Sequence, residues 1–156
     1  MTWGNPPKFK SNPPKKGKKI TPEMLAASGS EDGEQAALFC WAADSVGTYP
    51  QLRWLFAIPN GGSRHIAEAT KMVAGGVRSG VPDVCLPSPV HYRFKPYHGC
   101  FIEMKIEKRR KEVTGGVSKE QSEWISYLRY AGYYVAICYS WQEARDTLIN
   151  YLEGRV

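Results

Sequence analysis

The 156-residue sequence lacks the marks of several protein classes. It contains no apolar run near the roughly 20 residues of a membrane helix, and its Lys- and Pro-rich beginning lacks the apolar stretch of a secretory signal. No internal repeat is visible. The four cysteines stand far apart without a CxxC spacing, which disfavours a zinc site and favours reduced core thiols. We therefore expect one cytoplasmic domain whose Cys40, Cys85, Cys100 and Cys138 stay reduced.

Acidic residues are absent from the first 21 positions, which hold six of the 21 Lys and Arg residues. The rest of the chain balances 15 basic against 15 acidic residues, so the whole net charge of +6 belongs to this segment. Its four prolines argue against regular structure. The sequence thus predicts a flexible basic arm, residues 1–21, and a single domain, residues 22–156. The arm either contacts nucleic-acid phosphates or only solubilises the protein.

Caps and hydrophobic periodicity predict a helix, three strands, a helix, a strand and a final helix, with one further helix after the first strand. A short helix precedes these, opening at Thr21 and ending at Gly29. The expected helices cover residues 31–46, 65–74, 118–131 and 141–153, and the strands 52–58, 84–86, 101–106 and 133–139. Ser30, Ser118 and Ser140 are expected to cap three of these helices. Helical spacing places Leu38, Val73, Tyr127 and Leu148 on core-facing sides. Residues 87–98 are expected to form a loop, and the basic run from residue 108 a mobile segment. The continuously apolar strands indicate a sheet covered on both faces, hence the α/β class.

Two short apolar runs in the middle of the chain bring acidic residues to the same region. Asp83 opens the first run, and the second ends in Glu103-Met104-Lys105. Because strand side chains alternate between faces, Glu103 and Lys105 point the same way. If the runs pair, Asp83 joins them, which gives oxygen ligands for Mg²⁺ beside a cation that can hold water or phosphate.

The Pro-Asp step followed by Glu-x-Lys resembles the PD-(D/E)XK nuclease superfamily. Longer motifs are more specific: IPNGGSR at 58–64, GVRSGVPDVCLP at 76–87, GCFIEMK at 99–105 and SKEQSEWISYLRYAGYYVAICYSWQEA at 118–144. Together they resemble a VRR-NUC domain over residues 31–152, of the small stand-alone type encoded by bacteriophages and prophages. The resemblance implies a PD-(D/E)XK (restriction-endonuclease-like) fold, with a central mixed four-stranded sheet flanked by helices.

The resemblance also implies a set of site residues. Asp83, Glu103 and the backbone carbonyl of Met104 would bind one or two Mg²⁺ or Mn²⁺ ions. Lys105 would orient or help to deprotonate the attacking water, and Gln121, in an S-x-x-Q motif, would hydrogen-bond to the active centre.

A further acidic residue is expected on the first long helix. The family places a glutamate there, commonly four residues before a glutamine, and Glu31 stands in that relation to Gln35. Glu31 is therefore the expected site acid, acting through water, and Glu34 is the alternative. Acids in a first helical turn also complement the helix dipole, which is a purely structural explanation.

Polar residues near these motifs are expected to contact the nucleic-acid backbone. They are Asn60, Arg64, Arg78, Ser118, Lys108, Arg109 and Arg110. For several of them an ordinary loop or surface role is the alternative. His91 and His98 are assigned no role.

The resemblance implies a metal-dependent DNA endonuclease that leaves a 5′ phosphate. The resemblance to stand-alone members implies resolution of four-way (Holliday) junctions by a homodimer in the cytoplasm of a bacterial host. A flap endonuclease is one alternative. The other is a nucleic-acid binding module without catalysis, in which the acids are structural and the basic arm binds.

Deleting Met1 to Lys19 should weaken DNA affinity without changing which DNA structure is cut. Up to six phosphate contacts would be lost, and each contributes about 0.9 to the slope of log affinity against log salt. Fluorescence anisotropy with labelled DNA at several salt concentrations measures both quantities. An unchanged slope in the truncated protein would reduce the arm to a solubilising tail.

Overall fold

The computed structural model describes residues 19–59, 66–93 and 95–156. Most of the expected basic arm, residues 1–18, therefore lies outside the described residues, and its role stays a prediction. The helices are α1 (Pro22–Ala26), α2 (Glu31–Ser45), η1 (Pro50–Trp54), α3 (Ile66–Ala74), η2 (Glu107–Lys111), α4 (Lys119–Tyr130) and α5 (Trp141–Leu152). The strands are β1 (Phe56–Ala57), β2 (Val84–Leu86), β3 (Val90–Tyr92), β4 (Lys95–Tyr97), β5 (Cys100–Met104) and β6 (Tyr134–Cys138).

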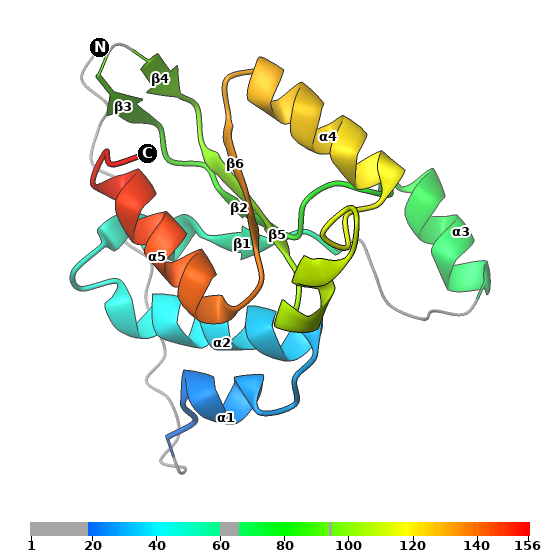
Figure 1. Ribbon diagram of the computed structural model, residues 1–156, viewed down its shortest axis with the longest axis horizontal. Coiled ribbons are helices and arrows are strands. Elements are labelled where there is room, and N and C mark those ends of the chain that lie inside the picture. The colour runs from blue at the N-terminus through cyan, green and yellow to red at the C-terminus, as the bar shows by residue number, and fades with distance from the viewer. Residues whose placement is uncertain (1–18, 60–65, 94) are drawn as a thin grey trace.

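A four-stranded sheet in the order β1-β2-β5-β6 lies at the centre of the fold (Figure 1). β1 pairs antiparallel with β2 and β2 antiparallel with β5, whereas β5 and β6 are parallel. Parallel neighbours need a crossover connection, and the segment containing α4 supplies it. The predicted α/β class and mixed four-stranded sheet are thus confirmed.

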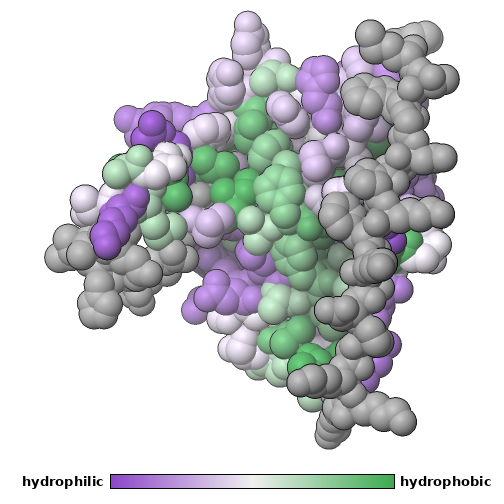
Figure 2. Space-filling view, turned by 180° about the vertical axis from the view of Figure 1, so that it is seen from behind, coloured by the Kyte–Doolittle hydropathy of each residue, from purple (hydrophilic) through white to green (hydrophobic). Residues whose placement is uncertain are grey.

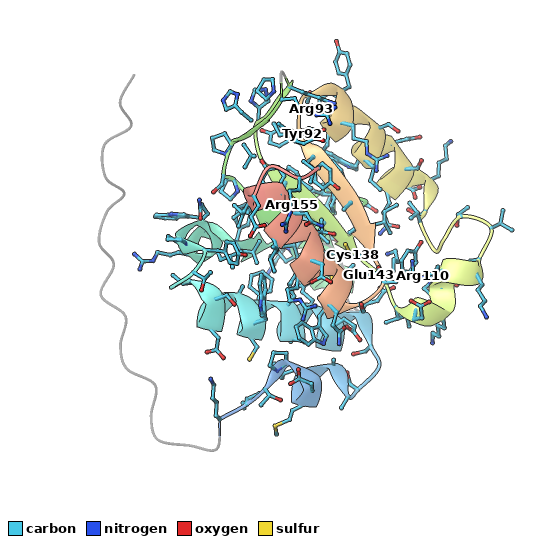
Figure 3. All side chains as sticks on the ribbon, turned by 60° about the vertical axis from the view of Figure 1, so that its left-hand side comes forward. Tyr92, Arg93, Arg110, Cys138, Glu143 and Arg155 are labelled. Carbon is cyan, nitrogen blue, oxygen red and sulfur yellow. The ribbon has the colours of Figure 1, made fainter. Side chains whose placement is uncertain are left out.

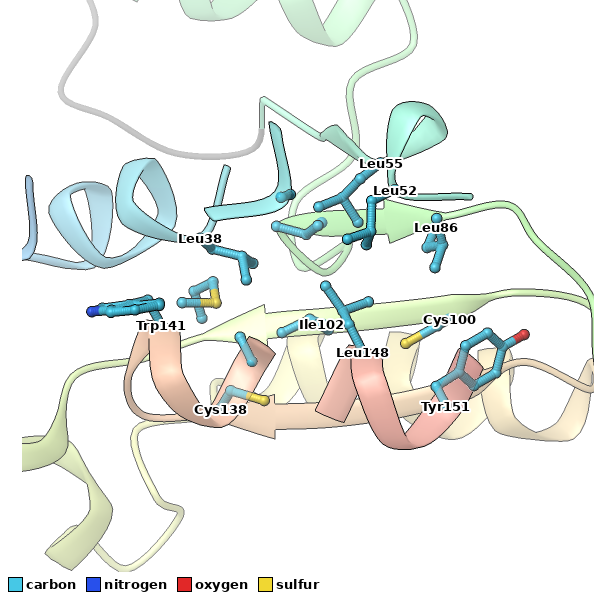
Figure 4. Packing of buried hydrophobic residues seen from close by; sticks show 14 of the residues in the cluster. Leu38, Leu52, Leu55, Leu86, Cys100, Ile102, Cys138, Trp141, Leu148 and Tyr151 are labelled. Carbon is cyan, nitrogen blue, oxygen red and sulfur yellow. The ribbon is translucent and has the colours of Figure 1, made fainter. Parts of the chain in front are cut away.

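One face of the sheet packs against α2 and α5. Cys100, Ile102 and Met104, alternate residues of β5, are buried in one cluster with Leu38 of α2 and Leu148 of α5 (Figure 4). Leu38 and Leu148 are fully buried, as their spacing in the sequence predicts. This face therefore contains most of the hydrophobic core.

The opposite face packs against α4 through a smaller cluster. Ile125 and Leu128 of α4 are buried with Val135 of β6, and Phe101 of β5 packs against them. Because β5 alternates, Glu103 lies on the same face as Phe101. The strand that stabilises the core on one side thus presents an acidic residue toward α4 on the other.

Serine caps predicted at three helix starts are confirmed. In each case the hydroxyl oxygen accepts a hydrogen bond from the backbone N–H three residues later. The pairs are Ser30 with Gly33, Ser118 with Gln121, and Ser140 with Glu143. These caps fix the starts of α2, α4 and α5.

The predicted buried strand over residues 52–58 is wrong for most of its length. Residues 50–54 form the short 3₁₀ helix η1, and β1 contains only two residues, both exposed. Leu52 and Leu55 enter the core three residues apart, which is the repeat of a 3₁₀ helix. A run that is apolar throughout cannot distinguish these two periods.

Four other expectations also need correction. Residues 87–98 are not an irregular loop, since β3 and β4 pair within them as a separate two-stranded sheet. The segment expected to be mobile after Glu107 begins with η2. Tyr127, expected to face the core, is 61% exposed, and Ile125 takes the inward position. The helix predicted at 65–74 is present as α3, but Val73 of its expected apolar stripe is 59% exposed.

The four cysteines are free, but only Cys85, Cys100 and Cys138 are buried, whereas Cys40 is half-buried. None of the helices in the described part of the chain is long and apolar enough to cross a membrane. The face opposite to that of Figure 1 has a band of hydrophobic side chains (Figure 2). Because apolar atoms make up much of any protein surface, this band by itself identifies no partner.

Candidate active site

The pairing of β2 with β5 brings Asp83 and Glu103 together. Val84 faces Ile102 in the antiparallel register, so the preceding residue, Asp83, stands opposite Glu103. Side chains of directly opposite residues project from the same face of a sheet. Asp83 Oδ2 also accepts a hydrogen bond of 2.8 Å from the backbone N–H of Met104. The two predicted metal-binding carboxylates therefore lie side by side.

Lys105 lies on the same face, as predicted. Its Nζ is 2.6 Å from Glu103 Oε1, and the two residues are 3% and 0% exposed. The backbone N–H of Lys105 donates to the carbonyl of Cys138 at 2.8 Å, which extends the parallel pairing with β6 beyond the end of β5. A buried ion pair thus occupies the end of the central strand.

Gln121 reaches the same carboxylate from α4. Its Nε2 donates to Glu103 Oε1, while its Oε1 accepts from the backbone N–H of Ser118 at 2.8 Å. The capping box that starts α4 therefore also orients the side-chain amide toward the sheet. Gln121 lies where the S-x-x-Q motif predicts it.

Glu31, rather than Glu34, faces the carboxylates. Its Oε1 is 4.0 Å from Lys105 Nζ and 3.9 Å from Arg109 NH1. Glu34 instead accepts a hydrogen bond of 2.6 Å from the backbone N–H of Trp141 at the start of α5. The geometry therefore favours Glu31 and gives Glu34 a structural contact.

These residues line a pocket of about 380 Å³. Its wall is built by the segment before β2, where Gly80 has a φ of +84° and lies so close to Glu120 that a Cβ would approach the Glu120 backbone to 2.6 Å. Trp124 Nε1 donates to the Ser79 carbonyl at 3.0 Å and holds the same segment against α4. The pocket is thus assembled from the starts of α2, β2 and α4, the end of β5, and the segment after η2.

The charge state of the two carboxylates reflects their burial. Burial, together with the nearby charge of Asp83, raises the pKa of Glu103 from 4.5 to about 7, although Lys105 opposes this shift. Burial also raises the pKa of Asp83, and the hydrogen bond from Met104 opposes that shift. Bringing these acidic groups together in the site therefore costs free energy, and an additional positive charge would lower that cost.

The donor set fits a hard divalent cation. Glu31 Oε1 and Glu103 Oε2 are buried and accept no hydrogen bond from the described residues. Carboxylate oxygens are the ligands that Mg²⁺ and Mn²⁺ prefer. Within residues 19–59, 66–93 and 95–156, no group of three or more acidic, His or Cys side chains is arranged to hold a metal ion by itself. Mg²⁺ is commonly bound by one or two carboxylates together with water and substrate phosphates, which this arrangement allows.

The residues predicted to contact nucleic acid lie in different environments. Asn60 and Arg64 lie outside the described residues. Ser118 and Arg109 line the pocket, and Lys108 lines a second, adjacent pocket. Arg78 is exposed.

Arg110 does not face the pocket. It pairs with Glu107 at 2.9 Å and with Glu143 of α5, and its guanidinium lies 4.2 Å from the centre of the Tyr139 ring (Figure 3). These contacts attach η2 to the start of α5. The structure therefore favours a structural role for Arg110 over the predicted DNA contact.

The residues that complete the far wall of the pocket were not predicted from the sequence. Thr114 and Gly116 both line it, and Gly116 adopts a φ of +78° beside Arg109. The adjacent glycines at 115 and 116 indicate a turn. Their separation from the carboxylates along the sequence does not show how close they lie in space.

Comparison with known proteins supports a family assignment. A family model described as the VRR-NUC domain matches residues 30–142. A solved structure titled "VRR_NUC domain protein" superimposes with a TM-score of 0.59 at 21% sequence identity, covering 80% of this chain and 88% of that chain. At this identity the structural likeness shows the fold alone. No curated protein matches the chain.

The metal-free protein should lose stability as the pH rises through neutrality. A carboxyl whose pKa is raised by folding binds its proton more tightly in the folded state, so this contribution is complete below pH 4.5 and is lost as pH rises through about 7. For Glu103 the loss is up to about 3 kcal/mol. Urea unfolding in EDTA between pH 4.5 and 8 should show this slope in the wild type and a smaller slope in Glu103→Gln.

Glu123→Gln is the matched control, because Glu123 is exposed on α4. It should keep the wild-type pH dependence. Equal slopes in the wild type and in Glu103→Gln would show that Glu103 titrates normally.

Proposed function

The chain belongs to the VRR-NUC domain family, a nuclease-type family, and on that basis we propose that it is an Mg²⁺- or Mn²⁺-dependent DNA endonuclease of the PD-(D/E)XK superfamily. The observation that supports this proposal most directly is the convergence of Asp83, Glu103 and Lys105 in one pocket. Gln121 joins them from a separate helix. Two carboxylates and a lysine of this kind suit hydrolysis of a phosphodiester bond.

Each residue has a defined task in this reaction. Asp83, Glu103 and the Met104 carbonyl would hold an Mg²⁺ or Mn²⁺ ion, and Glu31 would reach it through water. The ion would lower the pKa of the attacking water and neutralise charge on the phosphate.

Lys105 orients the water and assists its deprotonation. Its Nζ is fixed by the 2.6 Å contact with Glu103. Gln121 keeps the Glu103 carboxylate in one orientation, since it donates to the same oxygen as Lys105. Fixed donors of this kind need no reorganisation during the reaction.

A binding module without catalysis fits the pocket less well. Asp83, Glu103 and Glu31 each repel a phosphate in the absence of a cation, and the repulsion is strongest where water is excluded. A protein that only binds DNA gains nothing from carboxylates gathered in such a pocket. The acidic pocket therefore favours hydrolysis.

We further propose that the substrate is a four-way junction and that the active form is a homodimer. One chain contains one set of site residues, whereas junction resolution needs paired cuts in opposed strands. A twofold dimer supplies the second site and matches the symmetry of the junction. A flap endonuclease, which needs only one cut, is the competing assignment.

Asp83→Asn and Glu103→Gln should each lower the cleavage rate by about 10²-fold or more while leaving DNA affinity in EDTA unchanged or increased. Each change removes a ligand charge and keeps the shape of the side chain. Cleavage of labelled DNA with Mg²⁺ and anisotropy in EDTA measure the two effects. Asp146→Asn, on the exposed side of α5, is the matched control. A near-normal rate in either site variant would rule out this metal site.

The protein should behave as a dimer in light scattering and cut a four-way junction at two symmetry-related positions. Mapping the cuts on each labelled strand, beside flap, duplex and single-stranded DNA, tests the substrate. A monomer that nicks a flap in preference to a junction would exclude the resolvase assignment but keep the nuclease.

A further inference from the structure

Arg109 differs from the other basic residues of η2. It lies on the pocket wall with Asp83, Glu103 and Lys105. Lys108 and Lys111 are exposed, and Arg110 is held by Glu107 and Glu143. Only one cation of this basic run therefore faces the pocket.

Two neighbours fix the position of Arg109. Its Nε and NH2 atoms donate to the two carboxylate oxygens of Glu112, each at 3.0 Å. On its other side is Gly116, where a Cβ would lie 2.8 Å from Arg109 Nε and 2.9 Å from Arg109 Cβ. A larger residue at position 116 would displace the guanidinium. The bidentate pair and the absent side chain together determine where the arginine points.

The NH1 edge of Arg109 stays available. Its nearest acidic atom is Glu31 Oε1 at 3.9 Å, which is too long for a hydrogen bond. No described residue accepts a hydrogen bond from NH1. The donors on this edge are therefore free for a ligand that enters the pocket.

The charged residues of the pocket indicate which kind of ligand Arg109 would bind. Among the described residues, three acids and two cations, Lys105 and Arg109, line the pocket. Lys105 is paired with Glu103 and is assigned to the attacking water. An incoming phosphate therefore meets a second cation with unused donors, Arg109.

We propose that Arg109 donates from its NH1 edge to a non-bridging oxygen of a DNA phosphate in the pocket, and that Glu112 and Gly116 are positioning residues for it. This inference rests on the proposed DNA nuclease function. A guanidinium suits the contact because its planar set of donors matches the geometry of phosphate oxygens. Fixing it in advance lowers the ordering cost of binding.

The test compares Arg109→Ala, Arg109→Lys and Glu112→Gln with Lys111→Ala, which removes the same charge from the same turn. Arg109→Ala should lower kcat/KM by about 30-fold or more and reduce the salt slope of DNA binding by about 0.9, the value for one phosphate contact. Arg109→Lys should keep the slope but recover only part of the rate, because the ammonium lacks the planar fork. Lys111→Ala should stay within about twofold of the wild type.

Glu112→Gln should lower kcat/KM by about fivefold and leave the salt slope unchanged, since the arginine remains. In the Arg109→Ala background it should have no further effect, because a positioning residue acts only through the residue that it holds. A multiplicative loss in the double variant would overturn this role. Melting temperatures of all variants monitor folding.

The outcomes separate this inference from the proposed function. If the wild type cuts DNA and Arg109→Ala binds and cuts like Lys111→Ala, the inference alone is wrong. If the wild type binds DNA but does not cut it, the nuclease assignment is wrong and the salt slope in EDTA still decides the Arg109 contact. If the wild type neither binds nor cuts DNA, both are wrong.

Discussion

The site depends on one interaction, the buried pair between Glu103 and Lys105. Both side chains are almost wholly withdrawn from water, and such a pair offsets its desolvation only when further hydrogen bonds satisfy it. Gln121 supplies one of these to Glu103 Oε1. Removing either partner would leave an uncompensated charge, which typically costs about 3–5 kcal/mol. The pair therefore constrains the position of the end of β5 relative to the start of α4.

Because residues of β5 alternate between the two faces of the sheet, those that stabilise the core lie on the face opposite to those of the site. Ile102 and Met104 face α2 and α5 and belong to the main core, whereas Phe101 packs against the α4 side. Glu103 and Lys105 lie on the same face as Phe101, at the polar end of the strand. The rigid core on one side thus supports the acidic pocket on the other, since a strand that is well packed on one face has little freedom to move on the opposite face.

The segment from 107 to 117 connects the pocket to the last helix. Arg110 joins η2 to Glu143 and Tyr139, and the hydroxyl of Tyr139 donates to the Gly115 carbonyl at 3.0 Å. Arg109, one residue earlier, faces the pocket from the same turn. Adjacent arginines thus have different roles, because one faces the body of the fold and the other the site.

The sequence by itself determined the α/β class, the serine caps of α2, α4 and α5, and the shared face of Glu103 and Lys105. These follow from local periodicity and hydrogen bonding over three or four residues. Its local patterns did not determine that residues 50–54 form a 3₁₀ helix or that Tyr127 is exposed. Both depend on which neighbouring element is present to cover an apolar side chain. The sequence favoured Glu31 and kept Glu34 as the alternative, and the tertiary structure supports Glu31, because Glu34 contacts the start of α5 whereas Glu31 approaches Lys105. The choice of Arg109 over Arg110 was decided only by tertiary structure, since adjacent helical residues differ in direction and only the packing of η2 shows which one meets the pocket.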